Sequence, residues 1–133
     1  MHRIRLAVKE NVLRNPLAVQ EDDYTSYLLN DGKGWVYEID SQVKGFAIVD
    51  LKNCDVWALF VDPLCEGRGI GSSLHDRMMT WYFGQTDTAL HVGTGAGTKA
   101  EQFYRKRGWE EVGKESNGDL TFIIRQKPLH LLS

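Results

Sequence analysis

The residues most suited to chemistry form a glycine-rich turn between a strongly apolar segment and an amphipathic one. The turn reads Val61-Asp62-Pro63-Leu64-Cys65-Glu66-Gly67-Arg68-Gly69-Ile70-Gly71-Ser72-Ser73. Glycine has no Cβ, so a ligand can approach its backbone closely. The first N–H groups of a helix are unpaired and lie at the positive end of its dipole, which favours phosphate. The segment therefore predicts a phosphate-binding turn, to which Arg68 can add a formal charge.

The spacing of this turn excludes two common nucleotide-binding motifs. A dinucleotide fingerprint GxGxxG that starts at Gly67 or Gly69 fails, because Ser72 or Leu74 replaces its third glycine. The P-loop motif GxxxxGK[ST] fails because Lys99 is preceded by threonine and followed by alanine. The spacing therefore argues against a nucleotide-binding regulatory domain that binds ATP or NAD.

The same turn resembles the signature of the GNAT superfamily of N-acetyltransferases, [QR]xxGx[GA] after an apolar strand. Here the signature reads Glu66-Gly67-Arg68-Gly69-Ile70-Gly71. The resemblance implies that the backbone amides of residues 67–72 hold the pyrophosphate of coenzyme A, with acetyl-CoA as the cosubstrate. The departure is Glu66, which places a carboxylate where the family has Gln or Arg.

A second segment also resembles the family: Ala100-Glu101-Gln102-Phe103-Tyr104-Arg105-Lys106-Arg107-Gly108-Trp109 is similar to AxxFYxxxG[FW]. The family's general acid falls on Tyr104, which would also contact the coenzyme. The family often has Asn three residues before the alanine, where this chain has Gly97. We keep Gly97 as a coenzyme-binding position, and Thr94 or Thr98 could supply the missing side-chain contact.

The resemblance further implies where the reactive group lies. In the family, pantetheine occupies a gap between the strand that ends here at Val61 and the strand that ends at Val92. The backbone of Phe60 or Val61 would then face the thioester carbonyl, and Tyr104 would lie near the sulfur. An N–H donor at the carbonyl and a proton for the leaving thiolate are what acyl transfer to an amine requires.

Two side chains are candidates for acid–base catalysis, and each has a structural alternative. Tyr104 could protonate the thiolate, or it could be a core tyrosine. Asp55 aligns with the base glutamate of the histone acetyltransferase branch when counted back from the glycine turn, or it could end a turn. Glu38, His75 and His91 are weaker candidates for a base, and we expect His75 to face solvent or a neighbouring strand.

Hydrophobic periodicity predicts the elements that must position these residues. Val56 to Val61 is apolar on both faces, which indicates a central strand, and Ile70, Leu74 and Met78 recur every four residues, which indicates a helix. The predicted class is α/β (α+β), a mixed and mostly antiparallel sheet flanked by helices in one domain, 1–133. The expected order of elements is β-αα-β-β-β-α-β-α-β-β. The first half comprises a strand over 2–8, one or two short helices within 11–30, a hairpin of 35–39 and 43–51, and a strand over 56–61. The second half comprises a helix from 70 to about 84, a strand over 89–92, a helix around 100–107, and strands over 109–112 and 120–124.

Composition narrows the classes of partner. The net charge of −2 among 133 residues provides no positive field for nucleic acid, so we expect no nucleic-acid partner. The longest apolar run is too short to cross a bilayer and there is no signal-peptide core, so we expect a cytoplasmic protein without a membrane partner. Cys54 and Cys65 lack metal-ligand spacing, so no metal is expected. Cys65 could be a catalytic thiol or simply occupy the loop.

These patterns predict an acetyl-CoA-dependent N-acetyltransferase that acts on a primary amine of a small molecule or peptide. The alternative is a non-catalytic sensor that binds acyl-CoA, which would keep the glycine turn without needing an acid at Tyr104. Strands near Leu120 to Ile124 could pair across a homodimer, which is common in the family, or remain monomeric.

Overall fold

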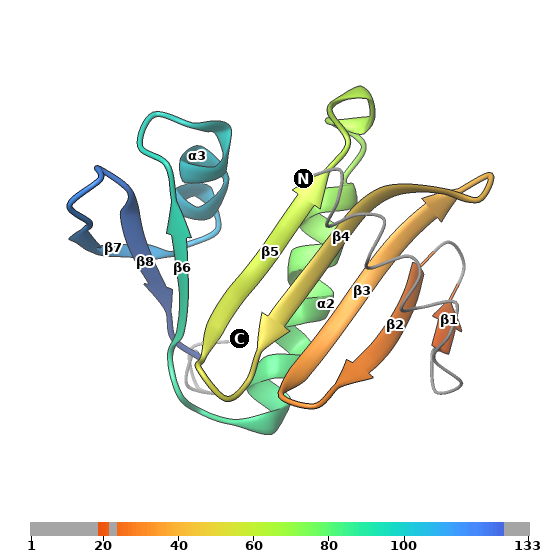
Figure 1. Ribbon diagram of the computed structural model, residues 1–133, viewed down its shortest axis with the longest axis horizontal. Coiled ribbons are helices and arrows are strands. Elements are labelled where there is room, and N and C mark those ends of the chain that lie inside the picture. Colours follow the sequence, from red (N-terminus) through yellow and green to blue (C-terminus); the bar gives the residue numbers. More distant parts are fainter. Residues whose placement is uncertain (1–18, 22–23, 127–133) are drawn as a thin grey trace, which may run out of the picture.

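The computed structural model describes residues 19–21 and 24–126, in which eight strands form one sheet that packs against two α-helices (Figure 1). The strand order in the sheet is β1-β2-β3-β4-β5-β6-β8-β7, and only β5 and β6 run parallel. The predicted mixed, mostly antiparallel sheet is therefore confirmed. The elements are β1 (Val19–Glu21), β2 (Tyr24–Leu29), β3 (Gly32–Ile39), β4 (Gln42–Asp50), β5 (Asp55–Val61), the 3-10 turn η1 (Pro63–Cys65), α2 (Ile70–Gln85), β6 (Leu90–Thr94), α3 (Lys99–Lys106), β7 (Glu110–Lys114) and β8 (Leu120–Ile124).

The predicted meander through residues 35–61 is confirmed, with a tight turn between β3 and β4. Asp40 and Ser41 form this turn with φ values of 52° and 65°. Two successive residues in the left-handed region give the type of turn whose twist matches an antiparallel hairpin. Local turn chemistry therefore sets the pairing next to the turn, and an irregularity between Tyr37 and Glu38 shifts the register further along the two strands.

The prediction of helices within residues 11–30 is wrong for the described part of that range, where β1 and β2 extend the sheet. Residues 11–18, like the strand predicted over 2–8, lie outside the described residues. In β2, Tyr27 is only 2% exposed and stands opposite Gly34 of β3. A Cβ on Gly34 would lie 2.6 Å from the Tyr27 ring, so the glycine makes room for the ring. Pairing with β3 thus overrides a residue spacing that also fits a helix.

Helix α2 confirms its predicted stripe and supplies the centre of the main core. Ile70, Leu74, Met78 and Tyr82 are each at most 4% exposed. They pack in one cluster with buried side chains of β3 to β6, of β8 and of the segment from α3 to β7. Helices α2 and α3 therefore cover the same face of the sheet, and their mutual packing fixes the two walls of the site.

The sheet divides between β5 and β6, as Figure 1 shows from the divergence of the two arrows. Their ladder contains one register pair, Asp55 with His91, at the start of both strands. Strand β5 also bulges, because Val49 and Ile48 of β4 pair with Val56 and Ala58 and leave Trp57 between them as an extra residue. Bulges bend a strand and increase its local twist. The two strands consequently separate toward α3 and the glycine turn.

Candidate active site

A cleft of about 710 Å³ opens between the far half of β5, the glycine turn and α3. It brings together most of the residues that the sequence predicted for coenzyme binding and catalysis. Those that line it are Phe60, Val61, Glu66, Gly67, Gly69, Ile70, Gly71, Ser72 and Tyr104. Arg68, Gly97 and Asp55 are not among its lining residues.

The glycine turn has the backbone geometry that its sequence suggests. Gly67 and Gly69 have φ values of 81° and 78°, in a backbone region that residues with a side chain rarely adopt. No atom lies within 4 Å of a Cβ built on either residue, so this side of the backbone is open. Gly69 is the N-cap of α2 and has no side chain to satisfy the first N–H groups of the 16-residue helix. These donors can therefore serve an anion in the cleft.

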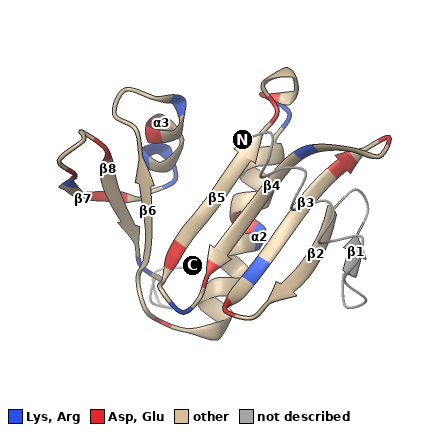
Figure 2. Ribbon diagram, in the orientation of Figure 1, with Lys and Arg blue, Asp and Glu red and all other residues tan. Residues whose placement is uncertain are grey.

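Three cations on the opposite wall of the cleft were not predicted as coenzyme ligands. Lys99, Lys106 and Arg107 all line it from α3 and its C-cap, and Figure 2 shows the basic residues on this helix. Arg107 donates to the Ser72 hydroxyl, and its buried Nε has no hydrogen-bond partner among the described residues. Lys106 and Arg107 follow Lys99 by seven and eight residues, which places all three on one side of a helix. This spacing is the sequence signal that could have predicted a basic wall of the cleft.

Glu66 and Lys99 form an ion pair that joins the two walls. The Lys99 Nζ lies 2.9 Å from the Glu66 Oε2, and the two side chains are 85% and 44% exposed. The carboxylate that departs from the family signature thus holds a cation of α3. Arg68, in contrast, is exposed and outside the cleft lining.

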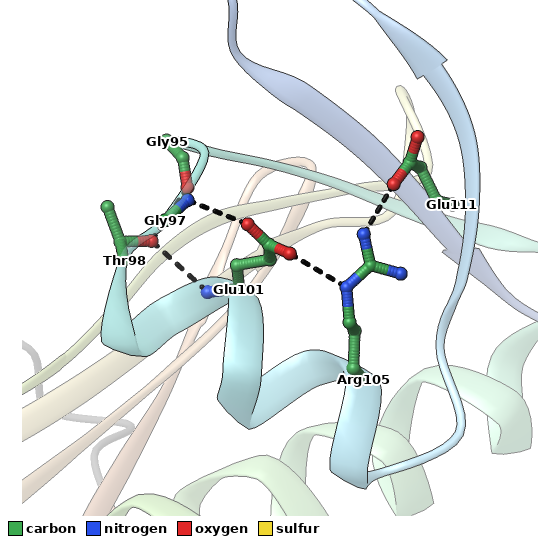
Figure 3. Close-up of polar contacts among 6 residues, drawn as sticks. All are labelled: Gly95, Gly97, Thr98, Glu101, Arg105 and Glu111. Atoms are coloured by element: carbon green, nitrogen blue, oxygen red, sulfur yellow. Dashed lines mark hydrogen bonds and ion pairs between the residues drawn. The ribbon is translucent and has the colours of Figure 1, made fainter.

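Gly97 belongs to the loop that starts α3 (Figure 3). Its φ is 75°, and its N–H donates to the Glu101 Oε1 at 2.7 Å. Thr98 is the N-cap of the helix and accepts from the Glu101 N–H at 3.2 Å. Glu101 also pairs with Arg105, which in turn contacts Glu111 of β7. This network anchors the N-terminus of α3, and with it the wall that carries Lys99.

Tyr104 points from α3 into a largely apolar environment and is only 4% exposed. Its ring packs edge-on against Trp109, with centroids 5.0 Å apart. Burial raises the pKa of Tyr104 well above its ordinary value, and the nearby Asp55 carboxylate raises it further. The phenol therefore keeps its proton throughout the physiological pH range, although the raised pKa also makes that proton harder to transfer.

Asp55 lies at the closed end of the gap, where β5 and β6 still pair. Burial raises the pKa of its carboxyl group, the facing Asp50 of β4 raises it further, and His91 opposes both effects. Asp50 ends β4 and Asp55 begins β5, and Figure 2 shows acidic residues at these adjoining strand ends. A raised pKa makes a carboxylate a better proton acceptor. Asp55 is thus within electrostatic reach of Tyr104 while lying outside the cleft lining.

The expectation that His75 faces solvent or a strand is wrong. It is 4% exposed and lies between α2 and α3, where its Nε2 accepts from the indole N–H of Trp109 at 3.0 Å. Its ring also contacts Phe103 edge-on. The position one residue after Leu74 lies off the main apolar stripe, so periodicity alone places it too close to solvent.

Within residues 19–21 and 24–126, no cluster of three or more His, Cys, Asp or Glu side chains has the arrangement needed to hold a metal ion. None of the helices described there is both long and apolar enough to cross a membrane.

The sensor alternative and the N-acyltransferase prediction both use the glycine turn, but only the second needs a proton donor on the opposing wall. Tyr104 occupies that wall, so the cleft has the arrangement expected of a coenzyme A-dependent N-acyltransferase. Comparison with known proteins agrees: the model of the acetyltransferase (GNAT) domain matches residues 30–111, more than half of the chain. The protein belongs to the GNAT family of acetyltransferases.

Individual proteins similar to this chain share less than a third of its residues over the aligned part. The peptidyl-lysine N-acetyltransferase YjaB of Salmonella typhimurium is 29% identical over 109 residues, which cover 81% of this chain and 71% of the relative. A GNAT acetyltransferase structure from Staphylococcus aureus Mu50 has a TM-score of 0.66 at 21% identity and covers 76% of this chain and 72% of its own. A Bacillus anthracis structure, described as a streptothricin acetyltransferase in complex with acetyl coenzyme A, has a TM-score of 0.64 at 15% identity, over 74% of this chain and 64% of its own.

Proposed function

We propose that this chain transfers the acetyl group of acetyl-CoA to a primary amine, with the coenzyme in the cleft between β5 and α3. The observation that carries the proposal is that one cleft is lined both by the open glycine turn and by the buried side chain of Tyr104, which bears a hydroxyl group. The N–H groups of residues 67–72 would hold the pyrophosphate. Lys99, Lys106 and Arg107, which line the cleft, would add positive charge around the phosphates.

Bound acetyl-CoA supplies the thioester, and side chains of the protein donate and accept the protons. The amine nitrogen attacks in its neutral form, and once the new C–N bond has formed it loses one proton to water, which can pass it on to Asp55. As the C–S bond breaks, Tyr104 gives its phenolic proton to the departing sulfur and recovers one from solvent. A backbone N–H near Phe60 or Val61 would stabilise the oxyanion, because both residues line the cleft where β5 has left β6.

The acceptor that we propose to test first is a lysine side chain of a peptide. The Salmonella relative acts on peptidyl-lysine by its name, and the Asp50 and Asp55 pair at the closed end of the gap favours a cationic amine. Small-molecule amines are the other acceptor class. We further propose a cytoplasmic enzyme that is either monomeric or dimeric, which light scattering would distinguish.

The deciding experiment replaces Tyr104 by Phe, which keeps the packed ring and removes the hydroxyl. We expect kcat to fall by about 100-fold, the lower end for acid–base catalysis, with little change in the Kd for coenzyme A. Tyr27→Phe is the matched control, because this buried tyrosine lies in the other hydrophobic cluster. An unchanged kcat for Tyr104→Phe would refute the general-acid role, and absence of turnover with any amine in the parent protein would favour the sensor.

A further inference from the structure

Helices α2 and α3 are joined by a buried polar contact that the proposed chemistry does not use. The Trp109 Nε1–H donates to the His75 Nε2 at 3.0 Å, and both residues are 4% exposed. Trp109 follows α3 directly after Gly108, so the bond ties the end of that helix to the middle of α2. A buried histidine–indole bond is more specific than apolar packing, because it fixes a direction for both rings.

The contact also fixes the protonation state of His75. Because the indole can only donate, the Nε2 must carry no hydrogen and the proton resides on Nδ1. That atom lies 3.1 Å from the Asp76 Oδ1, which accepts the bond. Burial lowers the pKa of His75, the Asp76 carboxylate on the same helix opposes this effect, and the Arg107 guanidinium of the facing wall adds to it. His75 is therefore neutral at physiological pH and able to accept.

The two rings that flank Tyr104 both rest on His75. Trp109 contacts Tyr104 with centroids 5.0 Å apart and interplanar angle 72°, and Phe103 contacts it at 5.4 Å. The His75 ring lies edge-on to both, 6.1 Å from Trp109 and 5.7 Å from Phe103. The backbone N–H of Trp109 donates to the backbone carbonyl of Tyr104 at 3.1 Å. A change at His75 therefore reaches Tyr104 through both of its aromatic neighbours.

We propose that His75 is a positioning residue for the acid: by holding the indole of Trp109, it fixes the orientation of the Tyr104 phenol in the cleft. This inference rests on the proposed function, since orientation of Tyr104 matters for turnover only if its hydroxyl takes part. The contribution is geometric, because a catalytic group displaced by about 1 Å can lose about 100-fold in rate. His75 itself touches neither the coenzyme nor the acceptor in this role.

The test compares two substitutions at one position. His75→Phe keeps a ring of similar size but removes the acceptor, and we expect kcat to fall by about 10- to 100-fold with little change in coenzyme A affinity. His75→Gln offers a carbonyl oxygen near the former Nε2 and should recover most of the rate. Trp109→Phe, which removes the donor, should lower kcat in the same manner. Equal and full activity of the folded His75→Phe and Trp109→Phe variants would overturn the proposal.

Two further measurements separate this role from a purely structural one. In a Tyr104→Phe background, His75→Phe should cause no further fall in kcat, whereas a general loss of stability would lower it again. At saturating acceptor, the parent should lose activity as pH falls through the lowered His75 pKa, because protonated His75 cannot accept from Trp109, and His75→Gln should lack that step. If His75→Phe does not fold, the pH profiles of kcat for the parent and for His75→Gln decide the question. Profiles that fall identically on the acidic side would refute the positioning role of His75.

The same variants distinguish failure of this inference from failure of the proposed function. If Tyr104→Phe lowers kcat and His75→Phe does not, the acid stands and the positioning role is refuted. If Tyr104→Phe leaves kcat unchanged, the general acid is refuted and the positioning role fails with it.

Discussion

Replacing Glu66 by Gln should strengthen coenzyme binding, since Glu66 is the only carboxylate among the residues described as lining the cleft. Three cations face it there, and Lys99 is already paired with Glu66 at 2.9 Å. The substitution keeps the size of the side chain, removes one negative charge near the phosphates and releases Lys99 to contact them. Loss of this exposed ion pair should change the free energy of unfolding by less than about 1 kcal/mol.

The expected gain follows from Coulomb's law. A unit charge about 6 Å from one phosphate charge contributes about 0.7 kcal/mol at the dielectric constant of water. Physiological salt, with a Debye length of about 8 Å, screens roughly half of this. Two phosphate charges within that range therefore give about 0.7 kcal/mol, which corresponds to a roughly threefold lower Kd.

Titration calorimetry with acetyl-CoA at low and high ionic strength would measure the effect. The gain should be larger at low ionic strength, because less of the interaction is screened. Glu110→Gln is the matched control: it removes the same charge from an exposed position on β7, away from the cleft. Weaker binding by folded Glu66→Gln, or an equal gain in the Glu110→Gln protein, would refute the electrostatic reasoning.

Three other changes test separate parts of the structure. Gly71→Asp should abolish the thermal shift caused by coenzyme A, because it adds a charge at the phosphate turn, and undiminished affinity in a folded variant would contradict the assignment. Thr98→Ala removes the N-cap of α3 and should cost about 1 kcal/mol in denaturant unfolding, whereas Thr98→Ser should retain stability. Burial raises the pKa of Tyr27 to about 12, so the unfolded chain loses this proton first above about pH 10, and the free energy of unfolding should fall by up to about 1.4 kcal/mol per pH unit from there to about pH 12. Tyr27→Phe should reduce that slope, and an unchanged slope would show that Tyr27 is not its source.

The elements that the sequence predicted correctly are those whose signals are local. Strands β3 to β5 combine alternating or continuous apolar residues with short turns of two and four residues, and α2 repeats its buried residues every four positions. Gly108, with a φ of 88°, ends α3 as expected of a helix C-terminus. In each case, the residues that decide the structure lie within a few positions of the element itself.

Strand β2 was predicted as part of a helical segment because its decisive contact is not local. Tyr24, Tyr27 and Leu28 have a spacing that also suits one helix face. The strand is determined by β3, where Gly34 leaves the space that the Tyr27 ring fills. A glycine seven residues away gives no periodic signal, and its meaning emerges only once the two strands are in register.

The unpredicted site contacts, Glu66 with Lys99 and His75 with Trp109, have a common physical origin in the packing of α2 beside α3. They span 33 and 34 residues. A helix that packs only on a sheet buries one stripe, and for α2 that stripe was predicted correctly. The α3 segment packs against a second side of α2 and buries the residues there. His75 follows Leu74 by one residue, which is a rotation of about 100° around the helix, and it is therefore buried as well. Sequence motifs identified most of the residues that line the cleft. The contacts between α2 and the segment that follows α3 depend on tertiary packing and require the three-dimensional structure.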